Sequence, residues 1–174
     1  MSSSPHLILI GLMGSGKSSV GELCARQLKR VFIDTDETIV TNTKTSISEL
    51  FDSGEESFRE LERDAVAQAC ATTTPAVIAC GGGAVVDPMS RDLIQLSGTV
   101  AWLQADPEEL ERRIGDTTTR PLLAGADPKQ VLTKLALERD GLYEKAANFK
   151  VNTHGLTVTE VADAVIQEYT QCRA

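Results

Sequence analysis

Gly11-Leu12-Met13-Gly14-Ser15-Gly16-Lys17-Ser18 fits the phosphate-binding pattern G-x-x-x-x-G-K-[ST]. The pattern needs glycines because the loop must turn until its backbone N–H groups point inward at phosphate oxygens. Its lysine supplies a cation for the β- and γ-phosphates of a nucleotide, and its last residue offers a hydroxyl to Mg²⁺. The stretch therefore predicts a site for ATP and Mg²⁺. The residues predicted to contact the nucleotide here are Gly14, Ser15, Gly16, Lys17, Ser18 and Ser19.

The residues on both sides of this loop support the motif. His6–Ile10, immediately before it, is a short apolar run that predicts a buried strand. After the loop, apolar residues recur at the spacing of one helix face, at Val20, Leu23, Cys24 and Leu28. The loop is therefore predicted to join a strand to a helix N-terminus, where the helix dipole favours phosphate. The flanking strand and helix disfavour the alternative, a glycine-rich turn that matches the pattern by chance.

Length and composition predict one globular domain over residues 1–174. The chain has 174 residues, of which 41% are hydrophobic, and this is enough to form a core. No apolar run approaches the roughly 20 residues of a membrane span. The segment Met1–Pro5 is short and polar, which argues against a signal peptide. We therefore expect a cytoplasmic protein without a membrane partner.

The net charge and the cysteines indicate which partners and which cellular compartment to expect. The net charge is −8, whereas a general nucleic-acid binder would more often be basic, so no nucleic-acid partner is expected. An acidic protein that binds ATP and an anionic substrate must concentrate its Arg and Lys locally. Cys24, Cys70, Cys80 and Cys172 show no C-x-x-C spacing. Because Cys24, Cys70 and Cys80 lie in apolar settings, the cysteines predict free buried thiols in a reducing cytoplasm and no zinc site.

Short apolar runs that alternate with helical patterns predict the fold class. The predicted strands are His6–Ile10, Val31–Ile33, Ala76–Ala79, Thr99–Leu103 and Phe149–Val151. Capping signals open helices at Ser46–Glu49, Asp87–Pro88, Asp106–Glu109, Asp127–Pro128 and Thr157–Glu160. This alternation predicts an α/β three-layer sandwich with a five-stranded parallel sheet, of the P-loop nucleoside-triphosphate hydrolase type.

The residues that follow the predicted strands carry the chemistry. In parallel sheets, ligands collect at the carboxyl ends of the strands. Gly11–Ser18, Asp34, Asp36 and Gly81–Gly83 all lie at such ends. The stretch Gly115–Gly125 has no periodicity and a glycine at each end, so it predicts a mobile loop.

Together these residues resemble the shikimate kinase family, small P-loop kinases related in fold to the nucleoside monophosphate kinases. The resemblance extends from about Leu7 to Thr153. The motifs that carry it are Gly11–Ser18, Asp34-Thr35-Asp36, Phe51 with Gly54-Glu55, Phe58-Arg59 with Glu62, Gly81–Gly83, Arg120-Pro121-Leu122-Leu123, and Arg139 followed by Leu142-Tyr143. A phosphate loop alone indicates only a superfamily, whereas this ordered set is far more specific.

The resemblance implies a function. It implies a kinase that uses ATP and Mg²⁺ to phosphorylate the 3-hydroxyl of shikimate, in the pathway to chorismate and the aromatic amino acids. It also implies a helical substrate-binding segment at about residues 34–64 and a lid at about residues 115–125. The expected partner is the small molecule shikimate, and the expected state is a monomer.

The resemblance implies that five residues bind the acceptor: Asp36, Arg59, Gly81, Gly82 and Arg139. Arginine suits the carboxylate of shikimate because it binds in a two-pronged geometry that lysine cannot match. Asp36 resembles the catalytic residue that engages the hydroxyl to be phosphorylated. It could act as a base or as an orienting group, because the loose transition state of phosphoryl transfer makes positioning important.

The resemblance also implies roles around the nucleotide. Lys17 and Arg120 are the catalytic cations, and Arg120 looks like the lid arginine that closes over the γ-phosphate. Arg113 resembles the residue that packs near adenine. Ser18 is the direct Mg²⁺ ligand, and Asp34 acts on the metal through water.

Each assignment has a structural alternative. Asp36 could cap the following helix, and Gly81–Gly83 could be a plain strand exit. Arg59 could pair with glutamates on its own helix. Arg113 and Arg139 could form surface ion pairs.

Two other functions stay open at this point. One is a kinase for another small hydroxy acid such as gluconate, and the other is a nucleotide-binding module without catalysis. Three features depart from the family pattern: Ser19, Val40 and the segment His154–Leu156, which lacks a proline. These departures concern the adenine pocket more than the transfer chemistry. His6 and His154 have no partner motif and are interpreted as structural or solvent-exposed.

Overall fold

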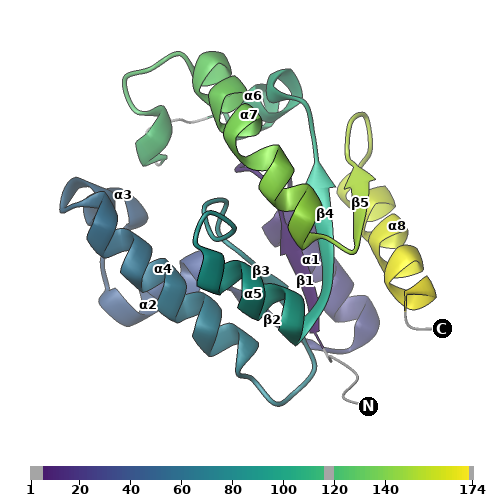
Figure 1. Ribbon diagram of the computed structural model, residues 1–174. Coiled ribbons are helices and arrows are strands. Elements are labelled where there is room, and N and C mark those ends of the chain that lie inside the picture. Colours follow the sequence, from purple (N-terminus) through teal and green to yellow (C-terminus); the bar gives the residue numbers. More distant parts are fainter. Residues whose placement is uncertain (1–5, 116–119, 173–174) are drawn as a thin grey trace.

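The computed structural model describes residues 6–115 and 120–172, built around a sheet of five parallel strands (Figure 1). The strands are β1 (His6–Ile10), β2 (Val31–Asp34), β3 (Ala76–Ala79), β4 (Gly98–Gln104) and β5 (Phe149–Asn152). Their order across the sheet is β2-β3-β1-β4-β5. The predicted α/β architecture is confirmed, and each predicted strand is present with ends that differ by no more than one residue.

The central strand β1 fixes the place of the phosphate loop. It pairs with β3 on one side and β4 on the other, with Ile8 opposite both Ile78 and Val100. All 5 of its residues are buried, as the apolar run predicts. Because the strand order reverses around β1, the loop that follows it lies at the switch point where doubly wound sheets bind ligands.

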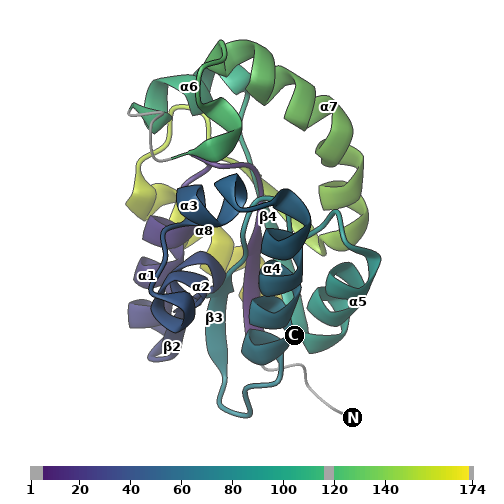
Figure 2. The ribbon, with the colours of Figure 1, turned by 90° about the vertical axis from the view of Figure 1, so that its left-hand side faces the viewer.

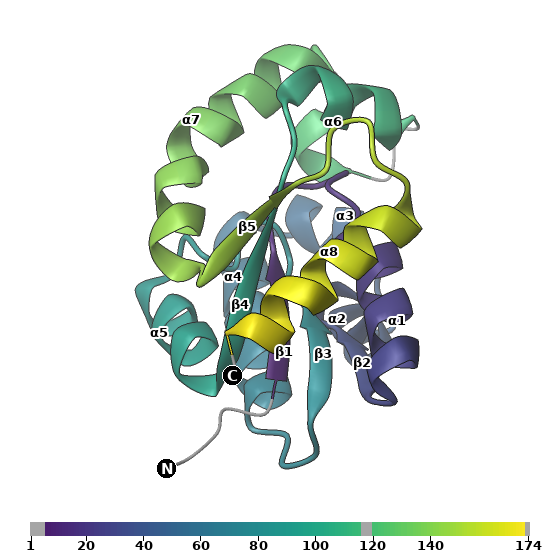
Figure 3. The same cartoon turned by 90° about the vertical axis from the view of Figure 1, so that its right-hand side faces the viewer.

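Helices cover both faces of the sheet. They are α1 (Lys17–Leu28), α2 (Thr35–Thr43), α3 (Ile47–Asp52), α4 (Glu55–Cys70), α5 (Pro88–Ser97), α6 (Pro107–Ile114), α7 (Pro128–Ala146) and α8 (Val158–Gln171), with a 3₁₀ turn η1 (Pro121–Leu123). Figure 3 shows α1 and α8 side by side in front of the sheet. Their buried residues, such as Cys24 and Val165, pack with Leu7 and Leu9 of β1.

The opposite face carries the larger core. Ile8 and Ile10 of β1 point there, because side chains alternate along a strand. They join Val66 of α4, Ile94 of α5 and Leu132 of α7 in one buried cluster. The helices on both faces complete the three layers of the predicted sandwich.

A smaller helical unit stands beside the carboxyl end of β2. Helices α2, α3 and α4 contact one another around a separate cluster of Ile39, Phe58 and Ala65. Figure 2 shows these three helices on the side that faces the viewer. They cover the segment that the sequence predicts to hold the acceptor.

Most helix-capping predictions are confirmed. Ser46 and Thr157 form capping boxes at α3 and α8, and Asp127 caps α7. The prediction that Asp106 caps α6 is wrong in one respect. Asp106 occupies the cap position, but its side chain makes no capping hydrogen bond. It lies 3.9 Å from Nδ1 of the exposed His154.

The prediction for the cysteines is confirmed in part, and that for His6 is confirmed. All four thiols are free, but only Cys24 and Cys80 are buried, whereas Cys70 is half-buried and Cys172 is exposed. His6 is buried at the start of β1 and accepts a hydrogen bond from the backbone N–H of Ala76 at 3.2 Å. Within residues 6–115 and 120–172, no helix is long and apolar enough to cross a membrane.

Candidate active site

The phosphate loop joins β1 to α1 as predicted. Gly14 and Gly16 have φ values of 79° and 93°, in the region that favours glycine. Gly16 is the N-cap of α1, which begins at Lys17. The first backbone N–H groups of α1 are therefore available at the carboxyl edge of the sheet, together with the positive end of the helix dipole.

Lys17 turns back onto its own loop in this structure. Its ammonium donates hydrogen bonds to the backbone oxygens of Gly11 at 2.8 Å and Leu12 at 2.9 Å. Burial lowers the pKa of Lys17 to about 8, and the carboxylates of Asp36 and Asp34 oppose this shift. The lysine is thus a cation held among acceptors that an incoming phosphate could replace.

Asp34 connects the phosphate loop to α2. The Ser18 hydroxyl donates to Oδ2 of Asp34 at 2.6 Å. Oδ1 of Asp34 accepts from the backbone N–H groups of Asp36 at 2.9 Å and Glu37 at 3.3 Å. Asp34 is therefore the N-cap of α2, and the alternative that Asp36 serves as this cap is wrong.

Asp36 is left free to face two cavities. Burial raises its pKa to about 6, and the neighbouring carboxylates of Asp34 and Glu62 add to the shift. Lys17 and Arg120 act in the opposite direction because they favour the ionised form. A carboxylate whose pKa is raised toward neutrality in a cleft is a candidate for proton transfer or for orienting a hydroxyl.

The first cavity, of about 310 Å³, lies between α7 and the helices α2, α3 and α4. Its polar wall is formed by Asp36, Arg59, Glu62, Arg120 and Arg139. The rest of its lining is largely apolar side chains and glycine backbone. Such a mixture suits a small, polar, negatively charged molecule with an apolar ring face.

The second cavity, of about 350 Å³, follows the phosphate loop. Residues that line it include Gly14, Gly16, Lys17, Ser18, Ser19, Asp34, Arg113 and Arg120. Both cavities share Met13, Asp36, Gly82 and Arg120. The cavity lined by the residues predicted to bind the nucleotide and the cavity lined by those predicted to bind the acceptor are therefore joined at Asp36 and Arg120.

The three arginines that line the first cavity, Arg59, Arg120 and Arg139, have different hydrogen-bond and ion-pair partners. Arg59 pairs with Glu62 at 2.7 Å and with Glu55 at 3.0 Å, so the predicted pairing on its own helix is present although Arg59 also lines the cavity. Arg139 is only 6% exposed, and its NH1 donates to the backbone oxygen of Gly82 at 3.1 Å. The alternative that Arg139 forms a surface ion pair is wrong. Among the described residues, Arg139 has no carboxylate partner.

Arg120 lies between the two cavities. Its Nε is buried and, among the described residues, has no hydrogen-bond partner. The predicted lid at residues 115–125 falls partly on 116–119, which lie outside the described residues. After Arg120 the chain forms η1, and Leu123 is buried at 1% exposure. In this structure Arg120 therefore lies at the junction of the two cavities.

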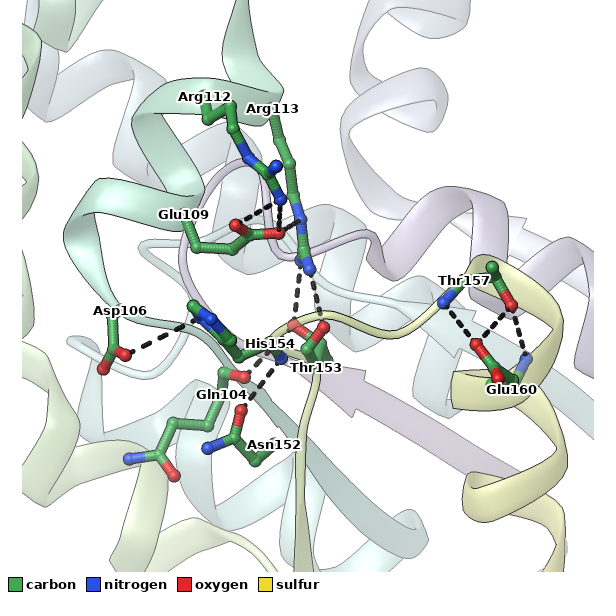
Figure 4. A network of polar contacts seen from close by, with 10 residues as sticks. All are labelled: Gln104, Asp106, Glu109, Arg112, Arg113, Asn152, Thr153, His154, Thr157 and Glu160. Atoms are coloured by element: carbon green, nitrogen blue, oxygen red, sulfur yellow. Dashed lines mark hydrogen bonds and ion pairs between the residues drawn. The ribbon is translucent and has the colours of Figure 1, made fainter.

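Arg113, which lines the second cavity, is fixed by three hydrogen bonds (Figure 4). Its Nε donates to Glu109 at 2.8 Å, and its NH1 and NH2 donate to the hydroxyl and backbone oxygen of Thr153 at 2.8 and 2.7 Å. Glu109 also pairs with Arg112, which lies largely in solvent. The bonds to Thr153 hold the loop after β5 against α6. The alternative that Arg113 forms a surface ion pair therefore accounts for its contact with Glu109 but not for its contacts with Thr153.

The glycine triplet Gly81–Gly83 is more than a strand exit, because it makes room for functional side chains. A Cβ on Gly81 would lie 2.7 Å from carboxylate oxygens of both Asp36 and Glu62. A Cβ on Gly83 would overlap NH1 of Arg59. A side chain at residue 81 or 83 would therefore displace these charged groups from their present positions.

This packing gives a first test. We expect Gly83→Ala to raise the KM for the acceptor about ten- to a hundredfold, because Arg59 must leave its present position. The KM for ATP should change little. Gly141→Ala is the matched control, because a Cβ at that helical position meets nothing within 4 Å. An unchanged acceptor KM in Gly83→Ala, measured by steady-state kinetics, would mean that Arg59 does not need this geometry.

Sequence reasoning missed several residues that hold the site together. Glu109 and Thr153 fix Arg113, and Thr35 and Tyr143 contact the glycine triplet. Thr35 and Tyr143 do belong to quoted motifs, but nothing in their spacing indicates a hydrogen bond to a distant glycine. Their contacts depend on the tertiary fold.

Comparisons with known proteins agree on one family. The family model described as shikimate kinase matches residues 13–170. A curated shikimate kinase from Francisella philomiragia is 42% identical over 161 residues, which cover 92% of each chain. Among solved structures, shikimate kinase from Acinetobacter baumannii in complex with shikimate gives a TM-score of 0.93 at 31% identity and covers 96% of this chain and 93% of its own. Shikimate kinase from Bacteroides thetaiotaomicron gives 0.84 at 28% identity, with 96% and 97% covered.

Proposed function

The chain belongs to the shikimate kinase family and phosphorylates shikimate with ATP, and from this premise we propose how its residues divide the work. The observation that carries the proposal is the junction of the two cavities at Asp36 and Arg120. A donor bound on the phosphate loop and an acceptor in the neighbouring cavity would meet there. Phosphoryl transfer depends mainly on such positioning and on charge stabilisation.

In the acceptor cavity, the carboxylate of shikimate binds to Arg139 and Arg59. Arg139 is the better supported of the two, because it is a buried cation without a carboxylate partner among the described residues. A buried charge of this kind is stabilised when an anion pairs with it. The 3-hydroxyl then points at Asp36, next to the glycine backbone at Gly81 and Gly82.

In the donor cavity, the phosphates of ATP bind to the backbone of the phosphate loop and to Lys17. Arg120 stands over the γ-phosphate, where the buried Nε finds the partner that it lacks in this structure. Arg113 lies beside the base. The two cations at the junction would stabilise the charge on the transferred group.

The oxygen donors beside the phosphate loop fit Mg²⁺. Magnesium prefers oxygen ligands and is usually held by one or two protein groups together with substrate phosphates. The Ser18 hydroxyl can offer a lone pair to the metal while it still donates its hydrogen bond to Oδ2 of Asp34, 2.6 Å away. Bound Mg²⁺ would neutralise charge on the β- and γ-phosphates. Asp34 would hold the Ser18 hydroxyl and act on the metal through water.

The wider organisation is also part of the proposal. Residues 1–174 act as one domain, with residues 34–64 as the acceptor-binding segment and residues 115–125 as the lid. We propose a monomer as the functional unit. We place the reaction in the cytoplasm, with no role for nucleic acid or a membrane.

The two rival functions make different demands on the site. A non-catalytic nucleotide-binding module would not need Lys17, Asp36 and Arg120 at one junction. A gluconate kinase would share the arginines but not the family match. Coupled ADP release with shikimate, gluconate and nucleoside monophosphates separates these cases, and turnover should appear with shikimate alone.

The acceptor site is tested by Arg139→Lys. We expect the KM for shikimate to rise about ten- to a hundredfold, because lysine keeps the charge but loses the two-pronged contact. The KM for ATP should stay within about twofold. Arg112→Lys is the control, since the Arg112 side chain is 73% exposed. A rise in the KM for ATP without a change for shikimate would place Arg139 outside the acceptor site.

A further inference from the structure

The glycine triplet spans the distance between the two acceptor-binding groups. On one side it contacts the start of α2, which carries Asp36. On the other side it contacts α7, which carries Arg139. Any shift of this backbone would change the spacing between the group that faces the hydroxyl and the group that faces the carboxylate.

Thr35 fixes the first residue of the triplet. It lies between Asp34 and Asp36, is fully buried, and accepts a hydrogen bond from the backbone N–H of Gly81 at 2.9 Å. The backbone oxygen of Gly81 accepts from the N–H of Ala84 at 3.1 Å. Both polar backbone groups of Gly81 are thus occupied, and one of them depends on a single side-chain hydroxyl.

Tyr143 fixes the second residue of the triplet. It is fully buried, its ring stacks on Trp102 with centroids 5.8 Å apart, and its hydroxyl donates to the backbone oxygen of Gly82 at 2.5 Å. Arg139, one helical turn earlier on α7, donates to the same oxygen at 3.1 Å. The position of the Arg139 guanidinium is therefore coupled to that of the Tyr143 hydroxyl.

Neither hydroxyl belongs to a wall of the two cavities. Thr35 and Tyr143 are absent from the residues that line either one. The backbone that they hold is tightly enclosed, since a Cβ on Gly81 would lie 2.7 Å from oxygens of Asp36 and Glu62. A displacement of a few tenths of an ångström is enough to disturb contacts of this kind.

We propose that Thr35 and Tyr143 are positioning residues, which hold Gly81–Gly83 from opposite sides and thereby set the spacing between Asp36 and Arg139. This inference rests on the proposed acceptor site. It concerns shikimate more than the nucleotide, because the triplet lies between Asp36 and Arg139, although Gly82 also lines the cavity along the phosphate loop. Thr35 and Tyr143 thus act through the backbone of other residues.

The test removes each hydroxyl with little change in volume. Thr35→Val leaves the Gly81 N–H without its partner, and we expect the KM for shikimate to rise about five- to fiftyfold. Tyr143→Phe should raise it about three- to tenfold, because Gly82 keeps its bond from Arg139. The KM for ATP should remain within about twofold in both variants.

Controls separate positioning from general loss of structure. Thr35→Ser keeps the hydroxyl and should restore the KM for shikimate to near the parent value. Thr38 lies on the same helix, and its hydroxyl bonds only to the backbone oxygen of Asp34, at 2.9 Å. Thr38→Val removes this hydroxyl and should leave the KM for shikimate and the KM for ATP unchanged. Thermal melting of every variant checks folding independently of activity.

A double-mutant cycle gives the sharpest result. Tyr143 and Arg139 share the Gly82 oxygen, so the effects of Tyr143→Phe and Arg139→Lys on the KM for shikimate should not add. Unchanged shikimate KM values in folded Thr35→Val and Tyr143→Phe, or equal rises for shikimate and ATP, would overturn the inference. If Arg139→Lys also leaves the KM for shikimate unchanged, the proposed acceptor site itself is wrong. If Arg139→Lys alone raises it, only the positioning role fails.

Discussion

Replacement of Lys17 by methionine is expected to lower kcat for shikimate-dependent ADP release about a thousandfold or more. The ammonium group is the cation that the phosphate loop offers to the transferred phosphoryl group, and methionine keeps the chain length without the charge. Electrostatic stabilisation of developing charge in a water-poor site is commonly the largest contribution to catalysis. The coupled assay at saturating shikimate measures the loss directly.

The local contacts of Lys17 sharpen this expectation. In this structure the ammonium donates to the backbone oxygens of Gly11 and Leu12, so it does not support the hydrophobic core. Lys17→Met should therefore fold and bind shikimate, as judged by thermal melting and by tryptophan fluorescence or calorimetry. Lys134→Met is a suitable control, because Lys134 is 77% exposed on α7. Substantial kcat in Lys17→Met would exclude the lysine from the transfer step.

Local signals in the sequence predicted the parts of the fold that depend on a few neighbouring residues. The phosphate loop, the buried strand before it and the capping boxes at Ser46 and Thr157 are examples. In each case the required groups lie within one turn or one strand. Such local agreement between motif, periodicity and caps is what makes these elements predictable.

The family resemblance implied helices within residues 34–64, but the bounds of α2 were not predicted, and its composition explains the omission. Thr35–Thr43 contains four threonines as well as Ile39 and Val40, and β-branched residues lower helix propensity. The helix forms because Asp34 caps it and because Ile39 packs against the cluster around Phe58. Tertiary packing thus overrides weak intrinsic preference.

Arg139 illustrates the other limit of sequence reasoning. It lies in the run Glu138-Arg139-Asp140, whose composition is typical of a solvent-exposed surface. In the fold its side chain points inward from α7 and contacts Gly82, 57 positions away in the sequence. A contact of this range cannot be derived from spacing. The family resemblance indicated the role of Arg139, and the structure supplies the burial.

Asp36→Asn is expected to lower kcat by about 10²- to 10⁴-fold, the range typical of lost acid–base or orienting groups. Binding of ATP should be retained, because the phosphate loop is untouched. Glu37→Gln is the matched control, since Glu37 is the next residue on α2 and is exposed. A kcat close to that of the parent enzyme would remove Asp36 from the reaction.

The pH dependence gives Asp36 a distinct signature. Because the pKa of Asp36 lies at about 6 in the folded protein, the carboxylate is lost as the pH falls through that value. The kcat/KM for shikimate should therefore fall about tenfold per pH unit below 6, whether the carboxylate removes a proton or orients the hydroxyl. Asp36→Asn should lose this acidic limb.

The ionised Asp36 carboxylate should also lower the stability of the folded protein, so that at high pH the parent unfolds more easily than Asp36→Asn. The folded pKa of about 6 lies above the ordinary value of 3.8, so the folded state binds this proton more tightly than the unfolded chain does. The resulting penalty is fully present above pH 6, diminishes as the pH falls, and disappears below about 3.8.

Asp36→Asn removes the charge that is buried near Asp34 and Glu62. Its melting temperature should therefore exceed that of the parent by about 2–6 °C at pH 8 and converge with it toward pH 4. If the variant is less active and also less stable at pH 8, Asp36 stabilises the fold, and the loss of activity cannot be assigned to the reaction alone.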